Sequence, residues 1–184
     1  MNEVQIVLAV QSLVFATPWM LTVAIICAKD LIFLNLLLAI WLLTSRKSQE
    51  RHAVFEAGWA VALALIVTSL LSHFIGRVRP FLSDPHVLLL IPAPLNTSFP
   101  SGHTATAVAI ACAIWFANKD LGIAAFVIAA FVAIGRIAVG VHYPTDILGG
   151  LFVGVLSFGI VRLAHHELAK RDIMRAAAQH HHDA

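Results

Sequence analysis

Long apolar runs separated by short polar breaks dominate the chain, and their lengths predict membrane-spanning helices. A helix needs about 20 mostly apolar residues to cross the hydrocarbon core of a bilayer. Five stretches are candidates, of which the third is short and the first is interrupted by Lys29 and Asp30: Leu21–Leu43, Ala53–Ile75, Ser101–Ala117, Leu121–Val141 and Ile147–Ala164. Val4–Phe15 is expected to form an interfacial or short buried helix that ends near Pro18. The pattern predicts an all-α, polytopic membrane helical bundle with about five transmembrane helices and a short N-terminal interfacial helix.

Composition supports a membrane environment. Hydrophobic residues make up 60% of the 184 residues and charged residues 12%, with a mean hydropathy of +0.88, whereas soluble domains have about 45–50% and about 25%. The net charge of +2 is too small to indicate a nucleic-acid partner. Cys27 and Cys112 lie in apolar runs and indicate neither a disulfide framework nor a zinc site. We expect one integral-membrane domain over residues 1–184, with an interfacial segment at 1–20 and a cytoplasmic tail at 165–184.

The distribution of positive charge predicts the orientation of the bundle. Basic residues cluster in alternate connections and in the tail: Arg46, Lys47, Arg51, Lys119, Arg162, Lys170, Arg171 and Arg175. Such segments face the cytoplasm, which puts the N-terminus outside and the C-terminus inside after five crossings. The connections Gly76–Pro100 and His142–Asp146 then share the outer face. Seven polar candidates gather there: Arg77, Arg79, Ser101, His103, Arg136, His142 and Asp146.

The motif FPSGHT, Phe99–Thr104, stands where a polar, proline-rich passage gives way to an apolar run. Ser101 is a plausible helix cap, and Gly102 permits close approach of a ligand. The unpaired N–H groups of a first helical turn bind anions, and phosphate in particular. Taken alone, the motif also fits an ordinary capped helix start with an interfacial histidine, His103.

The stretch GRIAVGVHYPTDILGG, Gly135–Gly150, places His142 and Asp146 four residues apart. If Pro144 opens a helix, Asp146 lies in its first turn and can reach back to His142. A carboxylate on one imidazole nitrogen leaves the other nitrogen available as nucleophile or base. Arg136 near the outer end of a span calls for an anionic partner, although an Arg136–Asp146 ion pair that ties two helices together is the alternative.

A third basic motif, GRVRPF at Gly76–Phe81, follows the second expected span. Arg79 and Pro80 form a stiff exit from the membrane, and an anchor for lipid headgroups is one interpretation. Two arginines and a helix N-terminus together would fit a tetrahedral oxyanion, because arginine donates in a planar fork.

Taken in order, these three motifs resemble the type 2 phosphatidic-acid phosphatase superfamily. The matching residues are Arg79-Pro80, then Pro100-Ser101-Gly102-His103, then Arg136, His142 and Asp146. The short length and the FPSGHT and GVHYPTDILGG stretches look most like the bacterial bacitracin-resistance branch, the undecaprenyl-diphosphate phosphatases. Two positions depart from the family pattern. Ser72 stands where a lysine is usual, with Arg77 or Lys29 as candidates to supply the charge, and Gly135 replaces a serine.

The resemblance implies a phosphatase domain that works without a metal or another cofactor. It assigns His142 as the nucleophile that becomes a phosphohistidine, Asp146 as the residue that orients it, and His103 as the acid and then the base. Phosphate binding would fall to Arg79, Ser101, Gly102 and Arg136, with Arg77 as a further candidate.

Undecaprenyl diphosphate on the outer face of a bacterial inner membrane is the expected substrate, with its polyprenyl tail in the bilayer. Phosphatidylglycerophosphate, phosphatidic acid and lipid A stay open as alternatives, because the motifs meet the same phosphate group in each. From another class, a transporter or lipid-binding membrane protein with a buried His–Asp relay also stays open. Clustering of the polar groups at one end favours hydrolysis. The sequence leaves the preferred lipid and the oligomeric state undetermined.

Overall fold

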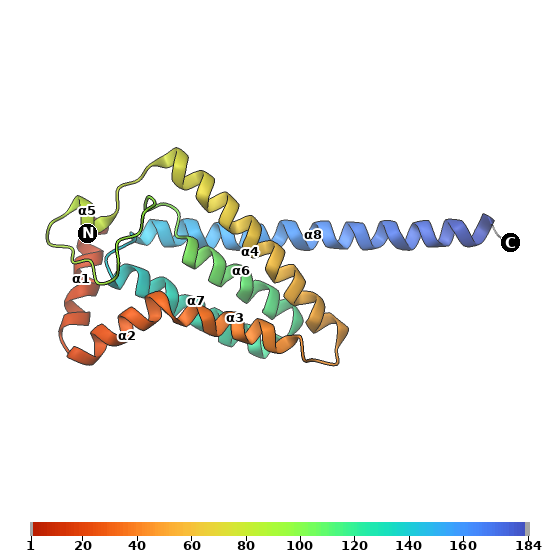
Figure 1. Ribbon diagram of the computed structural model, residues 1–184, viewed down its shortest axis with the longest axis horizontal. Coiled ribbons are helices and arrows are strands. Elements are labelled where there is room, and N and C mark those ends of the chain that lie inside the picture. The colour runs from red at the N-terminus through yellow and green to blue at the C-terminus, as the bar shows by residue number, and fades with distance from the viewer. Residues whose placement is uncertain (1, 183–184) are drawn as a thin grey trace.

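The computed structural model describes residues 2–182, and within that range the chain is all-helical and contains no strand. Figure 1 shows the arrangement of the helices. They are α1 (Glu3–Phe15), α2 (Pro18–Lys29), α3 (Leu31–Leu42), α4 (Ser48–Ile75), α5 (Pro80–Ser83), α6 (Gly102–Ala117), α7 (Lys119–Ala138) and α8 (Pro144–His182). The predicted all-α membrane bundle is confirmed.

Among the described residues, three helical segments are long and apolar enough to cross a membrane: Ser48–Ser83, Lys119–Ala138 and Pro144–Arg171. The expected span Leu21–Leu43 is not one straight helix. It forms α2 and α3, which bend by 48° at their junction and together could serve as a fourth span. The break falls at Asp30, where the sequence places Lys29 and Asp30 side by side in an otherwise apolar run. α6, the other expected crossing, has 16 residues, or about 24 Å at 1.5 Å per residue.

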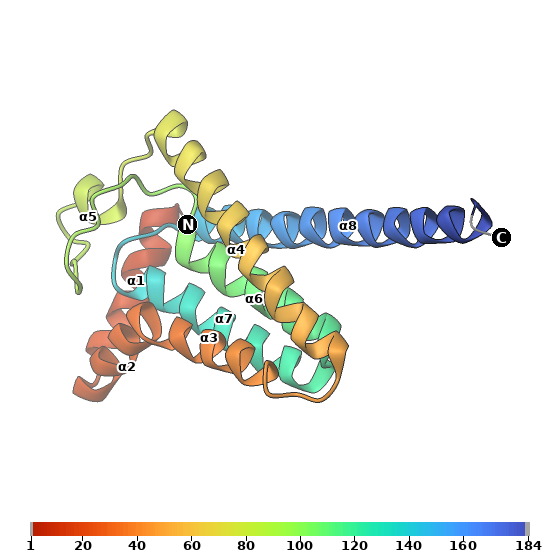
Figure 2. The ribbon, with the colours of Figure 1, turned by 45° about the vertical axis from the view of Figure 1, so that its right-hand side comes forward.

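Helix α6 can be short because other helices surround it. It packs against α3, α4, α7 and α8, and Figures 1 and 2 both place it in the middle of the bundle. Its alanines at positions 105, 107, 109, 111 and 113 are fully buried. The core around α6 is therefore built from small side chains, which allow helix backbones to approach closely.

Glycines of α8 set the distance to α6. A Cβ added at Gly150 would lie 2.5 Å from the carbonyl oxygen of Ser101, and one added at Gly154 would lie 2.5 Å from that of Ala105. Gly149 packs equally close to the ring of Phe99. The absence of side chains at Gly149, Gly150 and Gly154 therefore lets α8 pack closely against α6 and the residues that precede it.

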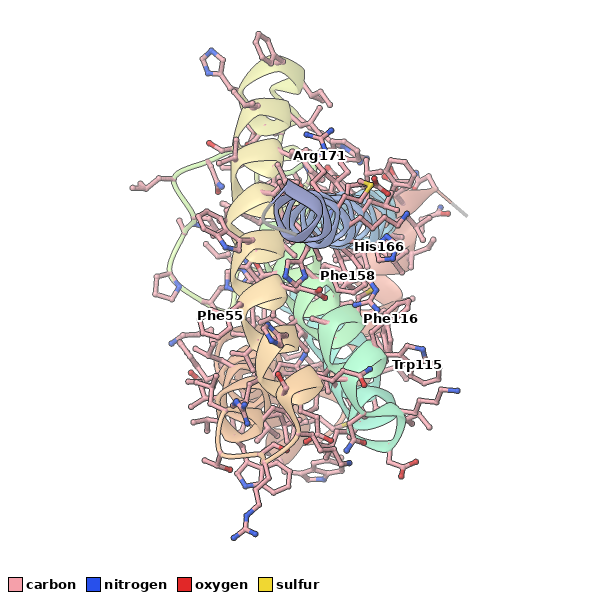
Figure 3. The ribbon with its side chains drawn as sticks, turned by 90° about the vertical axis from the view of Figure 1, so that its right-hand side faces the viewer. Phe55, Trp115, Phe116, Phe158, His166 and Arg171 are labelled. Carbon is pink, nitrogen blue, oxygen red and sulfur yellow. The ribbon has the colours of Figure 1, made fainter. Side chains whose placement is uncertain are left out.

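Helix α8 runs along the long axis of the molecule and extends well beyond the other helices (Figures 1 and 2). Figure 3 looks along α8 from its C-terminal end. Beside the C-terminal end of α6, Phe158 of α8 lies next to Phe116 with ring centroids 5.3 Å apart. At this end of the bundle Glu56 of α4 accepts hydrogen bonds from Arg162 and His165 of α8. The expected tail 165–184 continues as helix to His182, and residues 183 and 184 lie outside the described range.

Candidate active site

The candidate residues come together at the end of the bundle where α6 and α8 begin and α7 ends. Ser101 is the N-cap of α6, and Gly102 and His103 follow in its first turn. Arg136 lies in the last turn of α7 and Asp146 in the first turn of α8. A cavity of about 600 Å³ opens there, and its lining includes Arg79, Gly102, His103, Arg136 and His142. Both histidines therefore border one cavity, as the sequence motifs predict.

His142 and Asp146 lie side by side and are almost completely buried, with 3% and 0% of their surfaces exposed. The Nδ1 atom of His142 is 3.5 Å from Oδ2 of Asp146, and at this distance it has no hydrogen-bond partner among the described residues. Burial lowers the pKa of His142 to about 4, and the charges of Arg136 and Arg79 act in the same direction against the raising effect of Asp146. The imidazole is therefore neutral near pH 7 and keeps a nitrogen lone pair.

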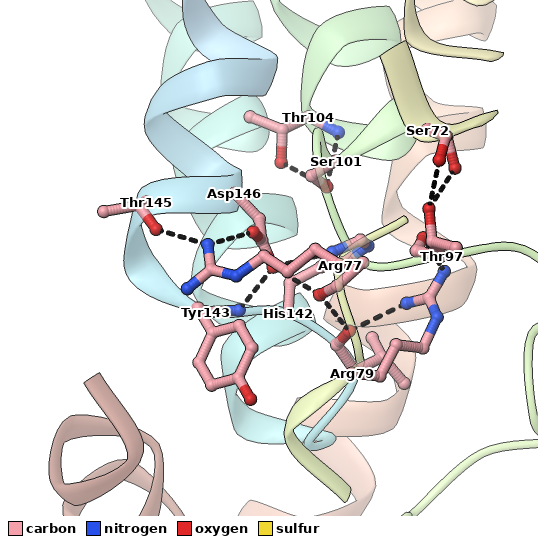
Figure 4. A network of polar contacts seen from close by, with 12 residues as sticks. Ser72, Arg77, Arg79, Thr97, Ser101, Thr104, His142, Tyr143, Thr145 and Asp146 are labelled. Atoms are coloured by element: carbon pink, nitrogen blue, oxygen red, sulfur yellow. Dashed lines mark hydrogen bonds and ion pairs between the residues drawn. The ribbon is translucent and has the colours of Figure 1, made fainter. Parts of the chain in front are cut away.

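Three hydrogen-bond donors hold the Asp146 carboxylate, and Figure 4 shows Arg77 and Tyr143 beside it. Ser98 Oγ donates to Oδ2 at 2.5 Å, and the Tyr143 N–H donates to the same oxygen at 2.8 Å. Arg77 Nη1 donates to Oδ1 at 2.7 Å. A buried carboxylate needs such partners, and together they fix where Asp146 stands relative to the imidazole.

Arg136 is 4% exposed, yet it makes few contacts of its own. Its Nη1 donates to the carbonyl oxygen of Ala28 at 3.1 Å, while its Nε has no partner among the described residues. The ion pairs of the described residues join Asp146 to Arg77 and His142, and none joins it to Arg136. The alternative in which Arg136 merely ties two helices through Asp146 is therefore wrong. Arg136 borders the cavity with donors available to an anion.

Arg79 also borders the cavity, but the protein uses most of its donors. Its Nε and Nη2 donate to the backbone and side-chain oxygens of Asn96 at 2.9 and 2.7 Å. The same Nη2 donates to the Thr97 carbonyl at 3.0 Å, and Nη1 donates to the Val141 carbonyl at 2.7 Å. Arginine has five N–H donors, so one remains for a ligand. With 3% of its surface exposed, Arg79 does not fit a headgroup anchor on the membrane surface.

Arg77 lies behind Asp146 and is not part of the cavity lining. Its Nη1 donates to Thr145 Oγ1 at 2.6 Å as well as to Asp146, its Nη2 pairs with Glu3, and its guanidinium lies 4.2 Å from the centre of the Tyr143 ring. This position suits a residue that orients Asp146 better than one that binds phosphate. Lys29, the other candidate to replace the family lysine, is exposed at the α2–α3 junction.

The start of α6 has the capped form that FPSGHT predicts. Ser101 Oγ accepts from the N–H and Oγ1 of Thr104 at 3.4 and 3.0 Å, and the Ser101 N–H donates to the Asp146 carbonyl at 3.0 Å. Ser101 is fully buried, so its hydroxyl serves the cap. A Cβ at Gly102 would meet only Thr68 Oγ1, at 3.8 Å. Packing does not require this glycine, and its lack of a side chain leaves the helix N-terminus open to the cavity.

Sequence reasoning missed several residues of the site. Ser98 directly precedes FPSGHT, and a lone serine in a loop gave no sign of its bond to Asp146. On the α4 side the cavity is lined by neutral hydrogen-bonding groups, among them Thr68, Ser69, Ser72, Asn96 and Thr97. Ser72 and Thr97 bond to each other through their hydroxyls at 2.6 Å. The position of the usual family lysine is thus part of a hydroxyl-rich wall.

Metal binding needs several converging ligands. Over residues 2–182, apart from the side chains of the C-terminal turns that are not described, no three His, Cys, Asp or Glu side chains lie close enough together to hold a metal ion.

Known proteins resemble this chain in both sequence and fold. Undecaprenyl-diphosphatase BcrC of Bacillus subtilis is 37% identical over 121 residues, which cover 66% of this chain and 61% of that protein. This chain thus spans about three fifths of the length of that relative. Decaprenylphosphoryl-5-phosphoribose phosphatase of Mycobacterium tuberculosis is 34% identical over 166 residues, 87% of this chain and 89% of that one.

Among solved structures, Aquifex aeolicus LpxE superimposes with a TM-score of 0.71 at 25% identity, covering 86% of this chain and 93% of that one. The sequence profile of the PAP2 superfamily matches residues 53–170, more than half of the chain and the whole stretch from Arg79 to Asp146. The chain therefore belongs to the PAP2 superfamily, the phosphatase family that its three motifs resemble.

Proposed function

We propose that this chain is a membrane lipid phosphatase that hydrolyses the terminal phosphate of undecaprenyl diphosphate through a phosphohistidine. One observation carries the proposal: a neutral His142, a second histidine, a buried arginine with unused donors and an open helix N-terminus all border one cavity. An inorganic anion is the ligand that such a group of donors suits. The name of the Bacillus subtilis relative, an undecaprenyl-diphosphatase, supports the choice of substrate.

The first chemical step would form a bond between His142 Nε2 and the terminal phosphorus. Asp146 lies beside Nδ1, so the proton of the neutral imidazole belongs on Nδ1 and the lone pair on Nε2. As the P–N bond forms, the bond from phosphorus to the bridging oxygen breaks, and protonated His103 gives its proton to that oxygen. Undecaprenyl phosphate leaves, and Asp146 stabilises the positive charge that develops on the imidazole ring.

The second step would return the enzyme to its starting state. A water molecule loses a proton to His103 and attacks phosphorus, the P–N bond breaks, and orthophosphate leaves from His142. During both steps the equatorial oxygens gather negative charge. Arg136, the Gly102 N–H and the remaining N–H of Arg79 are the donors that would hold these oxygens, because all three residues border the cavity.

The membrane gives the substrate its orientation. The site lies at the end of the bundle opposite the basic connection with Arg46, Lys47 and Arg51 and opposite Lys119. By the positive-inside rule the end with these basic residues is cytoplasmic. The cavity, at the other end, would therefore face the outside of a bacterial inner membrane. A polyprenyl chain could then remain in the bilayer while its diphosphate enters the cavity.

A second candidate substrate class follows from the wall of neutral groups on the α4 side. This wall offers hydroxyls and an amide, and Ser72 stands where the family pattern has a lysine. Its members are Thr68, Ser69, Ser72, Asn96 and Thr97. Neutral donors and acceptors suit the hydroxyls of a sugar or glycerol better than a second phosphate. A lipid-linked sugar phosphate or phosphatidylglycerophosphate fits this wall, and the mycobacterial relative is named for a phosphoribose substrate.

A panel of substrates separates these possibilities. Purified protein in detergent is given undecaprenyl diphosphate, phosphatidylglycerophosphate, phosphatidic acid, lipid A and a polyprenyl-linked sugar phosphate, each with and without EDTA, and phosphate release is measured. The proposal expects the highest kcat/KM for undecaprenyl diphosphate, little effect of EDTA, and no turnover by His142→Ala. A clear preference for the sugar or glycerol phosphates would favour the second class. Lipid transport in liposomes without phosphate release would favour the transporter.

A further inference from the structure

The first residue of α1 is tied to the candidate active site. Glu3 accepts hydrogen bonds from the backbone N–H and Oγ1 of Thr145 at 3.1 and 2.5 Å, and its other carboxylate oxygen pairs with Arg77 Nη2. Although burial raises the pKa of Glu3, the bonds from Thr145 and Arg77 lower it overall. An ionised carboxylate at the start of α8 also interacts favourably with the helix dipole.

Both partners of Glu3 lead directly to Asp146. Arg77 Nη1 donates to Asp146 Oδ1 at 2.7 Å, whereas His142 Nδ1 lies beside the other oxygen, Oδ2. Thr145 is the residue before Asp146 in the first turn of α8. A continuous series of contacts therefore runs from Glu3 through Arg77 to Asp146 and ends beside the imidazole of His142.

Helix α1 is anchored well enough to act as a support. Val7 is fully buried and packs with Val87 and Tyr143. Further along, Gln11 donates to the carbonyls of Leu88 and Ala138 and accepts from the Leu88 N–H. α1 is therefore fixed both to the end of α7 and to the connection before α6.

The separation of His142 and Asp146 explains why such a support matters. At 3.5 Å the two atoms are a few tenths of an ångström beyond a good hydrogen bond. A small movement of Asp146 decides whether the bond forms when charge develops on the imidazole. Arginine side chains lose rotamer entropy when they are fixed, so a residue that already holds Arg77 keeps its guanidinium on Asp146.

We propose that Glu3 is a positioning residue for this reaction, acting through Arg77 and the first turn of α8 to hold Asp146 against the nucleophile. The inference rests on the proposed function, because it assigns Glu3 to the step in which His142 attacks phosphorus. Glu3 itself does not border the cavity and touches no reacting atom.

The test compares Glu3→Gln with a matched control, Glu56→Gln. Glu56 is also a carboxylate bonded to an arginine and a second side chain, but it lies in α4 beside Arg162 and His165 of α8, away from the cavity. Glu3→Gln should lower kcat by about 10- to 100-fold with KM changed by less than about twofold, and Glu3→Asp should restore part of the loss. Glu56→Gln should keep the wild-type kcat. Thermal melting in detergent is measured for every variant.

A kinetic double-mutant cycle with Arg77→Gln completes the test. In that background Glu3→Gln should have little further effect on kcat, because the connection is already broken. Full additivity, wild-type kcat in Glu3→Gln, or equal losses of kcat and melting temperature in Glu3→Gln and Glu56→Gln would each overturn the inference. The proposed function fails separately: it fails if His142→Ala retains turnover, whatever Glu3→Gln does.

Discussion

Gly150→Ala tests whether close contact between α6 and α8 sets the geometry of the site. The added Cβ would lie 2.5 Å from the carbonyl oxygen of Ser101, about 0.9 Å inside the 3.4 Å at which ordinary contact begins, and 3.0 Å from Cβ of Thr104. The nearest atom belongs to backbone, so a side-chain rotation cannot relieve the clash. The two helices must separate by several tenths of an ångström.

That separation acts on both halves of the site. α6 carries Gly102 and His103, while α8 begins two residues after His142 and carries Asp146. A displacement near 1 Å between the acid and the nucleophile costs about 100-fold in kcat, and overpacking of this kind costs about 1–3 kcal/mol of stability. We expect Gly150→Ala to fold with a lower melting temperature and to lose about two orders of magnitude in kcat.

Gly159→Ala is the matched control, because it makes the same change on the same helix where nothing lies within 4 Å of the added Cβ. Phosphate release from lipid substrate in detergent, followed with melting curves, compares the two variants. The control should keep the wild-type rate, and its stability should match or exceed that of the wild type, since alanine favours a helix. Wild-type kcat in Gly150→Ala would refute the reasoning that this contact positions the catalytic groups.

Three further predictions concern the two buried arginines and the nucleophile. Arg136→Lys should keep a near wild-type melting temperature, because Arg136 makes a single hydrogen bond to the part of the chain that the structure describes. It should nevertheless lose about 10²–10³-fold in kcat, and activity within about tenfold of wild type would contradict its role at the phosphate. Arg79→Lys should instead lower the melting temperature clearly, because a lysine cannot replace four donations to loop oxygens worth about 1.5–3 kcal/mol each; unchanged melting would contradict that assignment. Burial lowers the pKa of His142 to about 4 from 6.5, so the nucleophile stays neutral as the pH falls. The single-turnover rate of phosphoenzyme formation should therefore not decrease between about pH 7 and pH 5. A rate that halves near pH 6.5 would show that the His142 pKa is not lowered.

Sequence alone predicts much of the site because the relevant signals are local. Ser101 caps the helix that begins within FPSGHT, and Pro144 begins the helix that places Asp146 near His142. The basic residues in alternate connections predict that these motifs lie at the same end of the bundle. Periodicity and hydropathy also indicate the spans, since burial in lipid leaves an uninterrupted apolar run. Each of these features depends on residues within a few positions of one another.

Pairing over long distances in the chain could not be predicted in the same way. From sequence, Arg136 is the arginine considered as an ion-pair partner of Asp146. The fold instead pairs Asp146 with Arg77, whose guanidinium also contacts Glu3 and Tyr143. Glu3 and Thr145 bond to each other although 142 positions separate them in the sequence. From sequence, Arg79 is expected to bind an anion. In the structure, three of its five N–H donors are used by oxygens of Asn96 and Thr97 in the α5–α6 connection.

The central prediction is that His142 carries the phosphoryl group during the reaction. Protein labelled with substrate bearing a radioactive terminal phosphate is quenched in alkali, where phosphohistidine survives, and the peptides are mapped by mass spectrometry. We expect the label on the peptide that contains His142, more of it in a His103→Ala variant that cannot activate water, and none in His142→Ala. Label on another residue, or steady phosphate release by His142→Ala, would contradict the central claim.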